Sequence, residues 1–249
     1  NMNTDYQKVK EQVLQECTVE GNVVKLPEGQ LDRKLYMEVA KALKLIGGKW
    51  KGGKVMGFVF PTDPTELLEQ IANGESRNLK KEFQFFATPD DLADYLVELA
   101  DIKEDDLVLE PSAGQGSIIN AILRVRPTKP VRYFELMDIN RTFLDKIMLA
   151  SCVGWDFLEC VDIYDKIIAN PPFSKNQDID HIYKMYECLN EGGRIITIAS
   201  KHWQSSNNKK ETQFREWLEE IGAYIEPIES GRFKESGTLV GANIIVINK

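Results

Sequence analysis

The sequence is poor in residues that bind metals or form disulfides. It has four cysteines and two histidines among 249 residues, and no two cysteines have the CxxC spacing typical of zinc sites. We therefore expect neither a metal site nor a disulfide framework, and the chain suits a reducing cytoplasm. The sequence also lacks any apolar run approaching the roughly 18 residues that span a bilayer, and no signal-peptide pattern opens it. We therefore expect no membrane association.

The chain also lacks the basic excess of a general nucleic-acid binder, because its formal net charge at pH 7 is −8. The first 85 residues hold 13 of the 31 Lys and Arg and 12 of the 39 Asp and Glu, so the acidity belongs to the remainder. Any surface that contacts phosphates must therefore be local. The length allows one large domain, or a domain with a small added module.

Residues 1–82 predict a small α+β module. The expected elements are helices over 4–16, over 32–46 and from 63 to about 73, with a hairpin over 18–26. Gly52-Gly53 separates two strand-like arms, which predicts a second hairpin with a two-residue turn. The polar-then-aromatic stretch 76–86 is the expected connector to the rest of the chain.

Five lysines and Trp50 occur between Lys41 and Lys54, with no acidic residue among them. Such a stretch can contact a nucleic-acid backbone and stack a base on the tryptophan. The favoured alternative is a solvated hairpin whose tryptophan packs into the core of the module.

From residue 83 to residue 249 the pattern changes to strands that alternate with helices, which is typical of a parallel α/β sheet. The expected strands are 107–109, a short one before Trp155, 131–134, 164–169, 194–199, 224–228 and 239–247. The expected helices are 90–99, 117–125, 140–150, 180–189 and 214–221.

Four of these strands end in an acid or an amide: Glu110, Glu135, Asp156 and Asn170. In an open parallel sheet, ligands bind beyond the carboxyl ends of the strands. A random scatter of acids over the surface would not readily place an acid or an amide at four successive strand ends. We therefore expect a ligand site at this edge of the sheet.

The glycine-rich turn Glu110–Gly116 (EPSAGQG) leads into a helix but matches no phosphate-binding fingerprint. The third glycine of a dinucleotide fingerprint is replaced by Ile119, and the Lys-Ser/Thr pair of a Walker loop is missing. Glu110 would repel a pyrophosphate and attract a cation. S-adenosylmethionine carries an ammonium, a sulfonium and a ribose diol. Glu135 could accept the ribose hydroxyls, and Asp156 the adenine amine with Phe157 against the ring.

The apolar run that precedes Asn170 is stopped by Pro171-Pro172, which cannot donate to a sheet ladder. This stiff corner carries Asn170 and Phe173 on either side of it. The amide of Asn170 and the flat ring of Phe173 suit a planar substrate with an amino group. An ordinary strand-to-loop corner is the alternative for such a tetrapeptide seen alone.

Together these motifs make the sequence similar to the class I S-adenosylmethionine-dependent methyltransferases, and most similar to the adenine-N6 DNA methyltransferases. Asn170-Pro171-Pro172-Phe173 resembles their catalytic tetrapeptide, and Phe86-Ala87-Thr88-Pro89 resembles their Thr-Pro element. The order of the motifs resembles the gamma arrangement. The resemblance covers about residues 83–249. It implies a Rossmann-like fold, with a seven-stranded mostly parallel sheet and helices on both faces.

The resemblance also implies roles for individual residues. The cofactor S-adenosyl-L-methionine would be bound by Phe86, Thr88, Pro89, Glu110, Pro111, Ser112, Gly114, Gly116, Glu135, Asp156 and Phe157. Asp138 is an alternative to Glu135 as the ribose ligand. The separate target-recognition domain of the family normally follows the catalytic domain, but here the chain ends at the last expected strand. Target recognition must then come from the amino-terminal module, from loops or from a partner subunit.

The expected chemistry needs no metal and no covalent intermediate. The Asn170 oxygen and the Pro171 carbonyl would accept the two N–H bonds of an exocyclic amine and free its lone pair, and the methyl group would move by direct displacement. Phe173 would stack on a flipped-out base.

Further substrate contacts are expected from Lys201 and Trp203 in the basic stretch 201–210, and from Phe233 in 231–237. The alternatives are a mobile surface loop and packing under the sheet edge. His181 is expected to be a packing or helix-start residue.

DNA adenine is the first predicted acceptor. An RNA base or a protein glutamine is the alternative, because those methyltransferases share the NPP-aromatic motif. A non-catalytic cofactor-binding subunit is a possibility of a different class, and the intact tetrapeptide argues against it. A nicotinamide oxidoreductase is disfavoured by the missing glycine.

Overall fold

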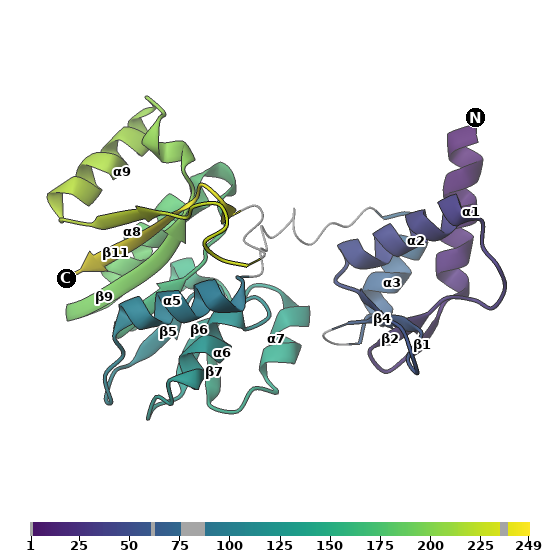
Figure 1. The fold of residues 1–249 in the computed structure, drawn as a ribbon, viewed down its shortest axis with the longest axis horizontal. Helices are drawn as coiled ribbons and strands as arrows, with labels where there is room; N and C mark the ends of the chain where they lie inside the picture. Colours follow the sequence, from purple (N-terminus) through teal and green to yellow (C-terminus); the bar gives the residue numbers. More distant parts are fainter. Residues whose placement is uncertain (1, 61–62, 76–87, 235–238) are drawn as a thin grey trace. The chain divides into compact units, whose positions relative to one another are not determined.

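The structure is a computed structural model that describes residues 2–60, 63–75, 88–234 and 239–249, excluding the side chains of 2–5 and 139. The chain divides into two compact units, Asn1–Phe85 and Phe86–Lys249 (Figure 1). The boundary predicted between residues 82 and 83 lies outside the described residues. Within the described part of the chain, no helix combines the length and the apolar character needed to cross a membrane.

The first unit packs helices against a small antiparallel sheet in the order β1-β2-β4-β3. Its elements are α1 (Met2–Glu16), β1 (Thr18–Glu20), β2 (Val23–Lys25), α2 (Arg33–Leu45), β3 (Lys49–Lys51), β4 (Gly57–Val59) and α3 (Thr65–Ala72). Leu14, Val24, Leu43 and Phe58 are fully buried in its core, so the predicted amphipathic helices and the hairpin over 18–26 are confirmed.

The second predicted hairpin exists, but its connection is longer than expected. The register pairs Lys51 with Gly57, so residues 52–56 all belong to the turn. Met56 has φ of +46°, in the left-handed region that few non-glycine residues adopt. A two-residue turn at Gly52-Gly53 is therefore wrong.

The second unit is an α/β structure around a seven-stranded sheet in the order β10-β11-β9-β8-β5-β6-β7. Its strands are β5 (Val108–Glu110), β6 (Val131–Phe134), β7 (Ala150–Gly154), β8 (Tyr164–Ala169), β9 (Leu189–Ala199), β10 (Tyr224–Pro227) and β11 (Asn243–Asn248). Its α-helices are α5 (Asp90–Ala100), α6 (Ser117–Arg124), α7 (Asp138–Leu144), α8 (Gln177–Glu187) and α9 (Lys209–Glu220), and its short 3-10 helices are η1 (Phe157–Glu159), η2 (Ser174–Asn176) and η3 (His202–Gln204).

The strand order reverses in the middle of this sheet. The chain runs outward through β5, β6 and β7, and it then returns to place β8 on the other side of β5. All pairings from β7 to β9 are parallel, and β11 is antiparallel to both of its neighbours. The carboxyl ends of β5 and β8 are therefore adjacent at a topological switch point, where such sheets bind ligands.

Alternating side chains bury both faces of the sheet. Ile168 and Ile196 pack in one cluster with α5 and α6, while Ile167 and Ile195 pack in another with α8 and α9. This two-residue alternation is what a central strand covered by helices on both sides requires. It explains why continuous apolar runs in the sequence correspond to strands here.

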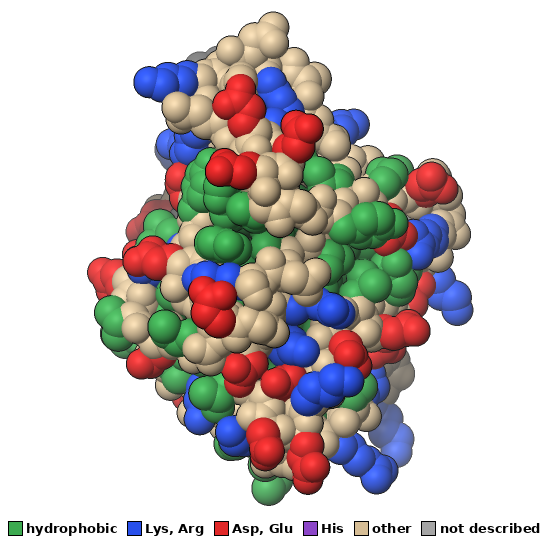
Figure 2. Space-filling view, turned by 90° about the vertical axis from the view of Figure 1, so that its left-hand side faces the viewer, with side chains coloured by type: hydrophobic (Ala, Val, Ile, Leu, Met, Phe, Trp, Pro, Cys, Tyr) green, Lys and Arg blue, Asp and Glu red, His purple; other side chains and the backbone are tan. Residues whose placement is uncertain are grey.

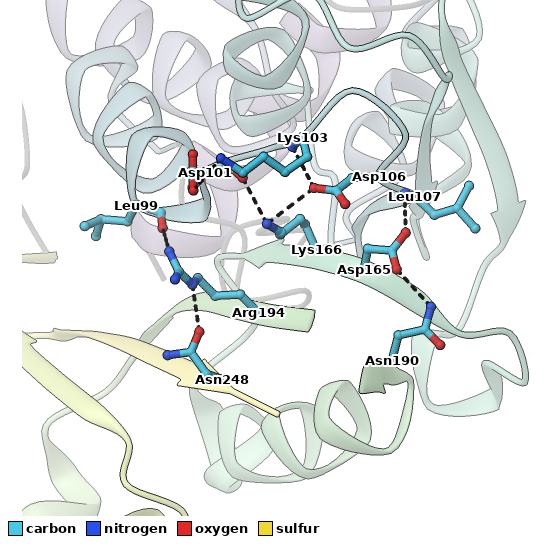
Figure 3. A network of polar contacts seen from close by, with 10 residues as sticks. All are labelled: Leu99, Asp101, Lys103, Asp106, Leu107, Asp165, Lys166, Asn190, Arg194 and Asn248. Atoms are coloured by element: carbon cyan, nitrogen blue, oxygen red, sulfur yellow. Dashed lines mark hydrogen bonds and ion pairs between the residues drawn. The ribbon is translucent and has the colours of Figure 1, made fainter. Parts of the chain in front are cut away.

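A polar network joins the opposite, amino-terminal ends of the strands (Figure 3). The Lys166 ammonium at the start of β8 donates to the Asp101 carbonyl at 2.9 Å and lies 3.3 Å from Asp106 Oδ2. Arg194 in β9 donates to the Leu99 carbonyl at 2.8 Å. These contacts anchor the end of α5 to the sheet, on the side away from the expected site.

Several predicted boundaries are wrong. The strand expected over 194–199 begins at Leu189, and the helix expected over 214–221 begins at Lys209. The helix expected over 140–150 ends at Leu144, and Ala150 already belongs to β7. The helix expected over 180–189 ends at Glu187, and Gly192-Gly193 lies inside β9 instead of terminating a helix. The last strand begins at residue 243, not 239. The strands predicted over 131–134 and 164–169 match β6 and β8.

Candidate functional site

The polar residues predicted at the strand ends meet at one edge of the second unit. Glu110 ends β5, while Glu135, Asp156 and Asn170 follow β6, β7 and β8. These four strands are parallel neighbours in the order β8-β5-β6-β7. Asn170 therefore emerges beside Glu110 at the switch point, and Glu135 and Asp156 follow outward along the edge.

The loop after β5 is folded back over this edge by the two glutamates. The Ser112 N–H donates to Glu110 Oε1 at 3.1 Å, and the Gly114 N–H donates to Glu135 Oε1 at 2.8 Å. Gly116 has φ of +92°, and a Cβ there would lie 3.1 Å from side-chain carbons of Leu144 and Ile147. The loop therefore requires glycine both for its conformation and for its close approach to the segment around α7.

Glu110 is an isolated buried carboxyl. Its residue is 1% exposed, and its Oε2 has no hydrogen-bond partner among the described residues. Burial raises the pKa of Glu110 well above its ordinary value, and the nearby Glu135 carboxylate adds to the rise. Such an oxygen is suited to accept a hydrogen bond from a cationic donor on a ligand.

Glu135 is buried and well bonded. Its Oε2 accepts the Met137 N–H at 2.9 Å and the Asn140 amide at 3.2 Å. Desolvation nevertheless raises its pKa. Asp138 instead lies in the first turn of α7, where its exposed side chain forms an ion pair with Arg141.

Asp156 and Phe157 form the corner after β7. Asp156 Oδ1 accepts the Leu158 N–H at 3.0 Å and caps η1. The Phe157 ring is 2% exposed and packs against Phe134 and His181, so it lies beneath the strand end, not open at the surface. Burial lowers the pKa of His181, which is a packing residue as expected.

The Asn170–Phe173 corner is tied to the segment before α5. Asn170 Nδ2 donates to Thr88 Oγ1 at 3.0 Å, and Pro171 is buried. Phe173 packs against the core cluster that includes Ile118 and Phe233. Thr88 is 6% exposed, Pro89 precedes α5, and Phe86 lies outside the described residues.

The predicted substrate-contact residues divide into one exposed lysine and three aromatic rings with packing roles. Lys201 is exposed after β9. Trp203 is 2% exposed and packs edge-to-face on Phe214, so the expectation of a surface tryptophan in 201–210 is wrong. Phe233 is 8% exposed and packs on Tyr95, which matches the alternative of packing under the sheet edge.

Trp50 belongs to the first unit and is 43% exposed. Its ring packs edge-to-face on the buried Phe58, to which it is also paired across the sheet. Because side chains alternate along a strand, Lys49 and Lys51 point to the other face of this sheet. The ring and these lysines therefore do not share a surface.

Sequence reasoning missed two features of the edge. The first is the contact that joins Thr88 to Asn170, because the Thr-Pro motif suggested only a cofactor role. The second is Trp155, which is 64% exposed beside Asp156 with the Arg141 guanidinium 4.2 Å above its ring. Only its position at a strand end could have indicated it. Among the described residues, no group of three His, Cys, Asp or Glu side chains is arranged to hold a metal ion.

No protein-family model matches the sequence, and no curated protein is significantly similar to it. Solved structures match in fold. A candidate RNA methyltransferase from Pyrococcus horikoshii has 19% identity and a TM-score of 0.51, over 69% of this chain and 90% of its own. TrmN from Thermus thermophilus has 17% identity and a TM-score of 0.50, over 90% of this chain and 70% of its own.

A candidate class I S-adenosylmethionine-dependent methyltransferase from Listeria monocytogenes also matches, with 13% identity and a TM-score of 0.51, over 74% of this chain and 66% of its own. At these identities the similarity concerns the fold. The second unit has the Rossmann-like fold of class I methyltransferases, as predicted.

Proposed function

We propose that this chain is an S-adenosylmethionine-dependent methyltransferase that modifies an exocyclic amino nitrogen, with N6 of adenine in DNA as the first acceptor. The observation that carries the proposal is the position of Asn170-Pro171-Pro172-Phe173. The tetrapeptide follows β8 at the switch point, directly beside the strand that ends in Glu110. Acceptor and cofactor sites would then be neighbours, as direct transfer requires.

The residues at the edge fit the cofactor. The unpartnered Glu110 Oε2 is a buried acceptor suited to the ammonium of the methionine end. Glu135 is the acid held at the strand end, whereas Asp138 is exposed and paired with Arg141, so we assign the ribose hydroxyls to Glu135. Asp156 is assigned to the adenine amine. When bound, the cofactor supplies an electrophilic methyl group on a sulfonium.

Asn170 is assigned to the acceptor. Its amide nitrogen donates to Thr88, so the carbonyl oxygen is the end of the amide that can accept an N–H from an amine. The Pro171 carbonyl would accept the second N–H. Together they would draw the amine nitrogen toward tetrahedral geometry, and Phe173 would stack on the base. The methyl group would leave the sulfonium as the S–C bond breaks, giving a neutral thioether. The methylated, cationic amine would then release one N–H proton to water, so no acid or base with a strongly shifted pKa is needed for this step.

Charge at the edge favours a nucleic-acid acceptor over a protein. Exposed lysines follow two neighbouring strands on the Asn170 side, Lys175 after β8 and Lys201 after β9. Near these lysines, Asp178 and Glu211 are fully buried, and Asp180 forms an ion pair with Lys210 at 2.8 Å. Figure 2 shows lysine and arginine side chains interspersed with acidic ones over the face that it displays. Phosphates would meet the lysines.

The first unit, or a partner subunit, is proposed to supply target recognition. The TrmN match extends over 90% of this chain, which is more than the length of the second unit. This supports a role for the first unit within the enzyme, with the second unit as the catalytic domain.

The decisive test is incubation of the chain with labelled S-adenosylmethionine and separate pools of DNA, RNA and protein, followed by nucleoside mass spectrometry. We expect N6-methyladenine in DNA with the wild type, and none with Asn170→Ala. Asn248→Ala, on an exposed residue at the end of β11 and at the opposite edge of the sheet, is the matched control and should retain full activity. Label found only in RNA or only in protein would select an alternative acceptor.

A second test separates the enzyme from a non-catalytic cofactor-binding subunit and from a nicotinamide enzyme. Thermal unfolding with S-adenosylmethionine and with NAD should show stabilisation by the first alone. Stabilisation of the wild type by the cofactor, together with no transfer to any pool, would instead support the non-catalytic subunit. Stabilisation by NAD alone would refute the proposal.

A further inference from the structure

Thr88 connects the acceptor corner to the cofactor loop. Its hydroxyl oxygen accepts the Asn170 amide N–H at 3.0 Å, across 82 positions of sequence. Its backbone carbonyl accepts the hydroxyl of Ser117, the first residue of α6 and the neighbour of Gly116. Thr88 is 6% exposed, so both contacts are shielded from water. Thr88 is therefore hydrogen-bonded both to the acceptor corner and to the first residue of the helix that follows the cofactor loop.

We propose that Thr88 is a positioning residue for Asn170, holding the amide in the orientation seen in the structure, with the nitrogen on Thr88 and the oxygen on the opposite side. An asparagine amide can rotate by half a turn and exchange its oxygen for its nitrogen. Only the oxygen can accept an N–H from an amine; the nitrogen would repel it. In this structure the amide nitrogen donates to the Thr88 hydroxyl, and this contact holds the amide plane with its oxygen on the side away from Thr88. This inference rests on the proposed function.

The Ser117 contact makes the position of Thr88 depend on the cofactor loop. Ser117 begins α6 immediately after the loop that Glu110 and Glu135 hold in place. A shift of that loop moves the Thr88 carbonyl and, through the same residue, the hydroxyl that orients Asn170. The acceptor amide is therefore oriented only when the cofactor side is in place. Thr88 acts through Asn170, which its hydroxyl contacts.

The test compares Thr88→Val, which has nearly the same shape but no hydroxyl, with Thr88→Ser, which keeps it. We expect Thr88→Val to lower kcat by about 10- to 100-fold, the range for loss of an orienting buried hydrogen bond. The KM for the acceptor and the calorimetric Kd for S-adenosylmethionine should change less than about twofold. Thr88→Ser should restore kcat to within about threefold of wild type. Ser117→Ala should give an intermediate loss.

A structural role or a direct cofactor role would give a different pattern. A packing defect would lower Tm and kcat together and would not be rescued by serine. A direct cofactor contact would raise the Kd for S-adenosylmethionine in Thr88→Val. Either result, or an unchanged kcat in Thr88→Val, overturns the proposal.

A readout that needs no acceptor distinguishes failure of this inference from failure of the proposed function. The side-chain amide resonances of Asn170 can be assigned by their loss in Asn170→Ala. In Thr88→Val they should shift and lose their protection from hydrogen exchange, whereas in Thr88→Ser they should remain close to wild type. Unchanged resonances in Thr88→Val refute the orienting contact even if the chain methylates a different acceptor. Changed resonances without any methyl transfer refute the function alone.

Discussion

Replacing Lys166 by Met should destabilise the second unit without affecting its site. The Lys166 and Asp106 side chains are only 10% and 16% exposed, and Lys166 also donates to the Asp101 carbonyl (Figure 3). Breaking a buried ion pair by removing one partner costs about 3–5 kcal/mol. Asp106 keeps the Lys103 N–H at 2.7 Å and some water contact, so we expect about 2–3 kcal/mol. For a chain of this size this lowers Tm by about 4–12 °C.

Urea unfolding followed by tryptophan fluorescence measures this loss. Of the four tryptophans, only Trp50 lies in the first unit, so the signal reports mainly on the second. Lys103→Met is the matched control, because its ion pair with Asp101 belongs to the same network but is largely exposed. We expect it to change the unfolding midpoint little.

The pairing can be isolated by a double-mutant cycle. Asp106→Asn removes the charge but keeps an acceptor for the Lys103 N–H. The double variant Lys166→Met/Asp106→Asn therefore has no unpaired carboxylate buried at this position. The double variant should be more stable than the sum of the single losses predicts, by about 1 kcal/mol or more. Additive losses, or a loss below about 0.5 kcal/mol for Lys166→Met alone, would refute the buried-pair reasoning.

Three further predictions concern the site itself. Burial raises the pKa of Glu110, so the folded chain keeps this proton to higher pH than the unfolded chain, and its contribution to stability is lost as pH rises through the folded pKa. Calorimetry from about pH 4 to about pH 8 should therefore show that the Tm of Glu110→Gln rises relative to the Tm of the wild type as pH increases. The variant should also bind S-adenosylmethionine more weakly than the wild type. A Tm difference that stays constant with pH would contradict this reasoning. Gly116→Ala should cost about 1–2 kcal/mol in urea unfolding, because the residue has φ of +92° and a Cβ would press on Leu144 and Ile147 at 3.1 Å. Gly52→Ala, at an exposed position outside the left-handed region, should be nearly neutral. Lys175→Ala and Lys201→Ala should each reduce the slope of log affinity for DNA against log salt by about 0.9, with S-adenosylmethionine binding unchanged; an unchanged slope in both would place the phosphates elsewhere.

The sequence predicts the centre of the sheet better than its margins. Residues 131–134 and 164–169 are short segments rich in β-branched and aromatic residues, which favour strands, and β6 and β8 occupy them. The predicted helix over 140–150 failed because Ile147 continues its apolar spacing while the chain turns away from the helix, with Leu149 at φ of +67° before β7. Apolar spacing contains no signal for a left-handed leucine.

Polar residues of the site were predictable where topology fixes them. Glu110, Glu135, Asp156 and Asn170 needed only the assignment of parallel strands, because the ends of such strands share one edge. Burial of aromatic rings was not predictable in the same way. Trp203 has polar and basic neighbours in sequence, but Phe214 from the next helix covers it. The contact between Thr88 and Asn170 spans 82 positions, and local patterns cannot reveal such a pairing.

Acidic and basic side chains occupy different parts of the edge, so a chain with a negative net charge could still bind a polyanionic acceptor. On the β5–β7 side, the Glu110 and Glu135 carboxyls are buried and directed into the loop, where they would face a cationic cofactor at short range. On the β8–β9 side, Lys175 and Lys201 are exposed, whereas Asp178 and Glu211 are buried and Asp180 is paired with Lys210. Within about a Debye length of 8 Å, a phosphate therefore experiences nearby lysines more strongly than the distant net charge. The net charge would govern the rate of long-range encounter, whereas Lys175 and Lys201 would govern binding at short range. At low salt the association rate with DNA should therefore be lower than that of a basic enzyme, and the affinity should depend on these two lysines.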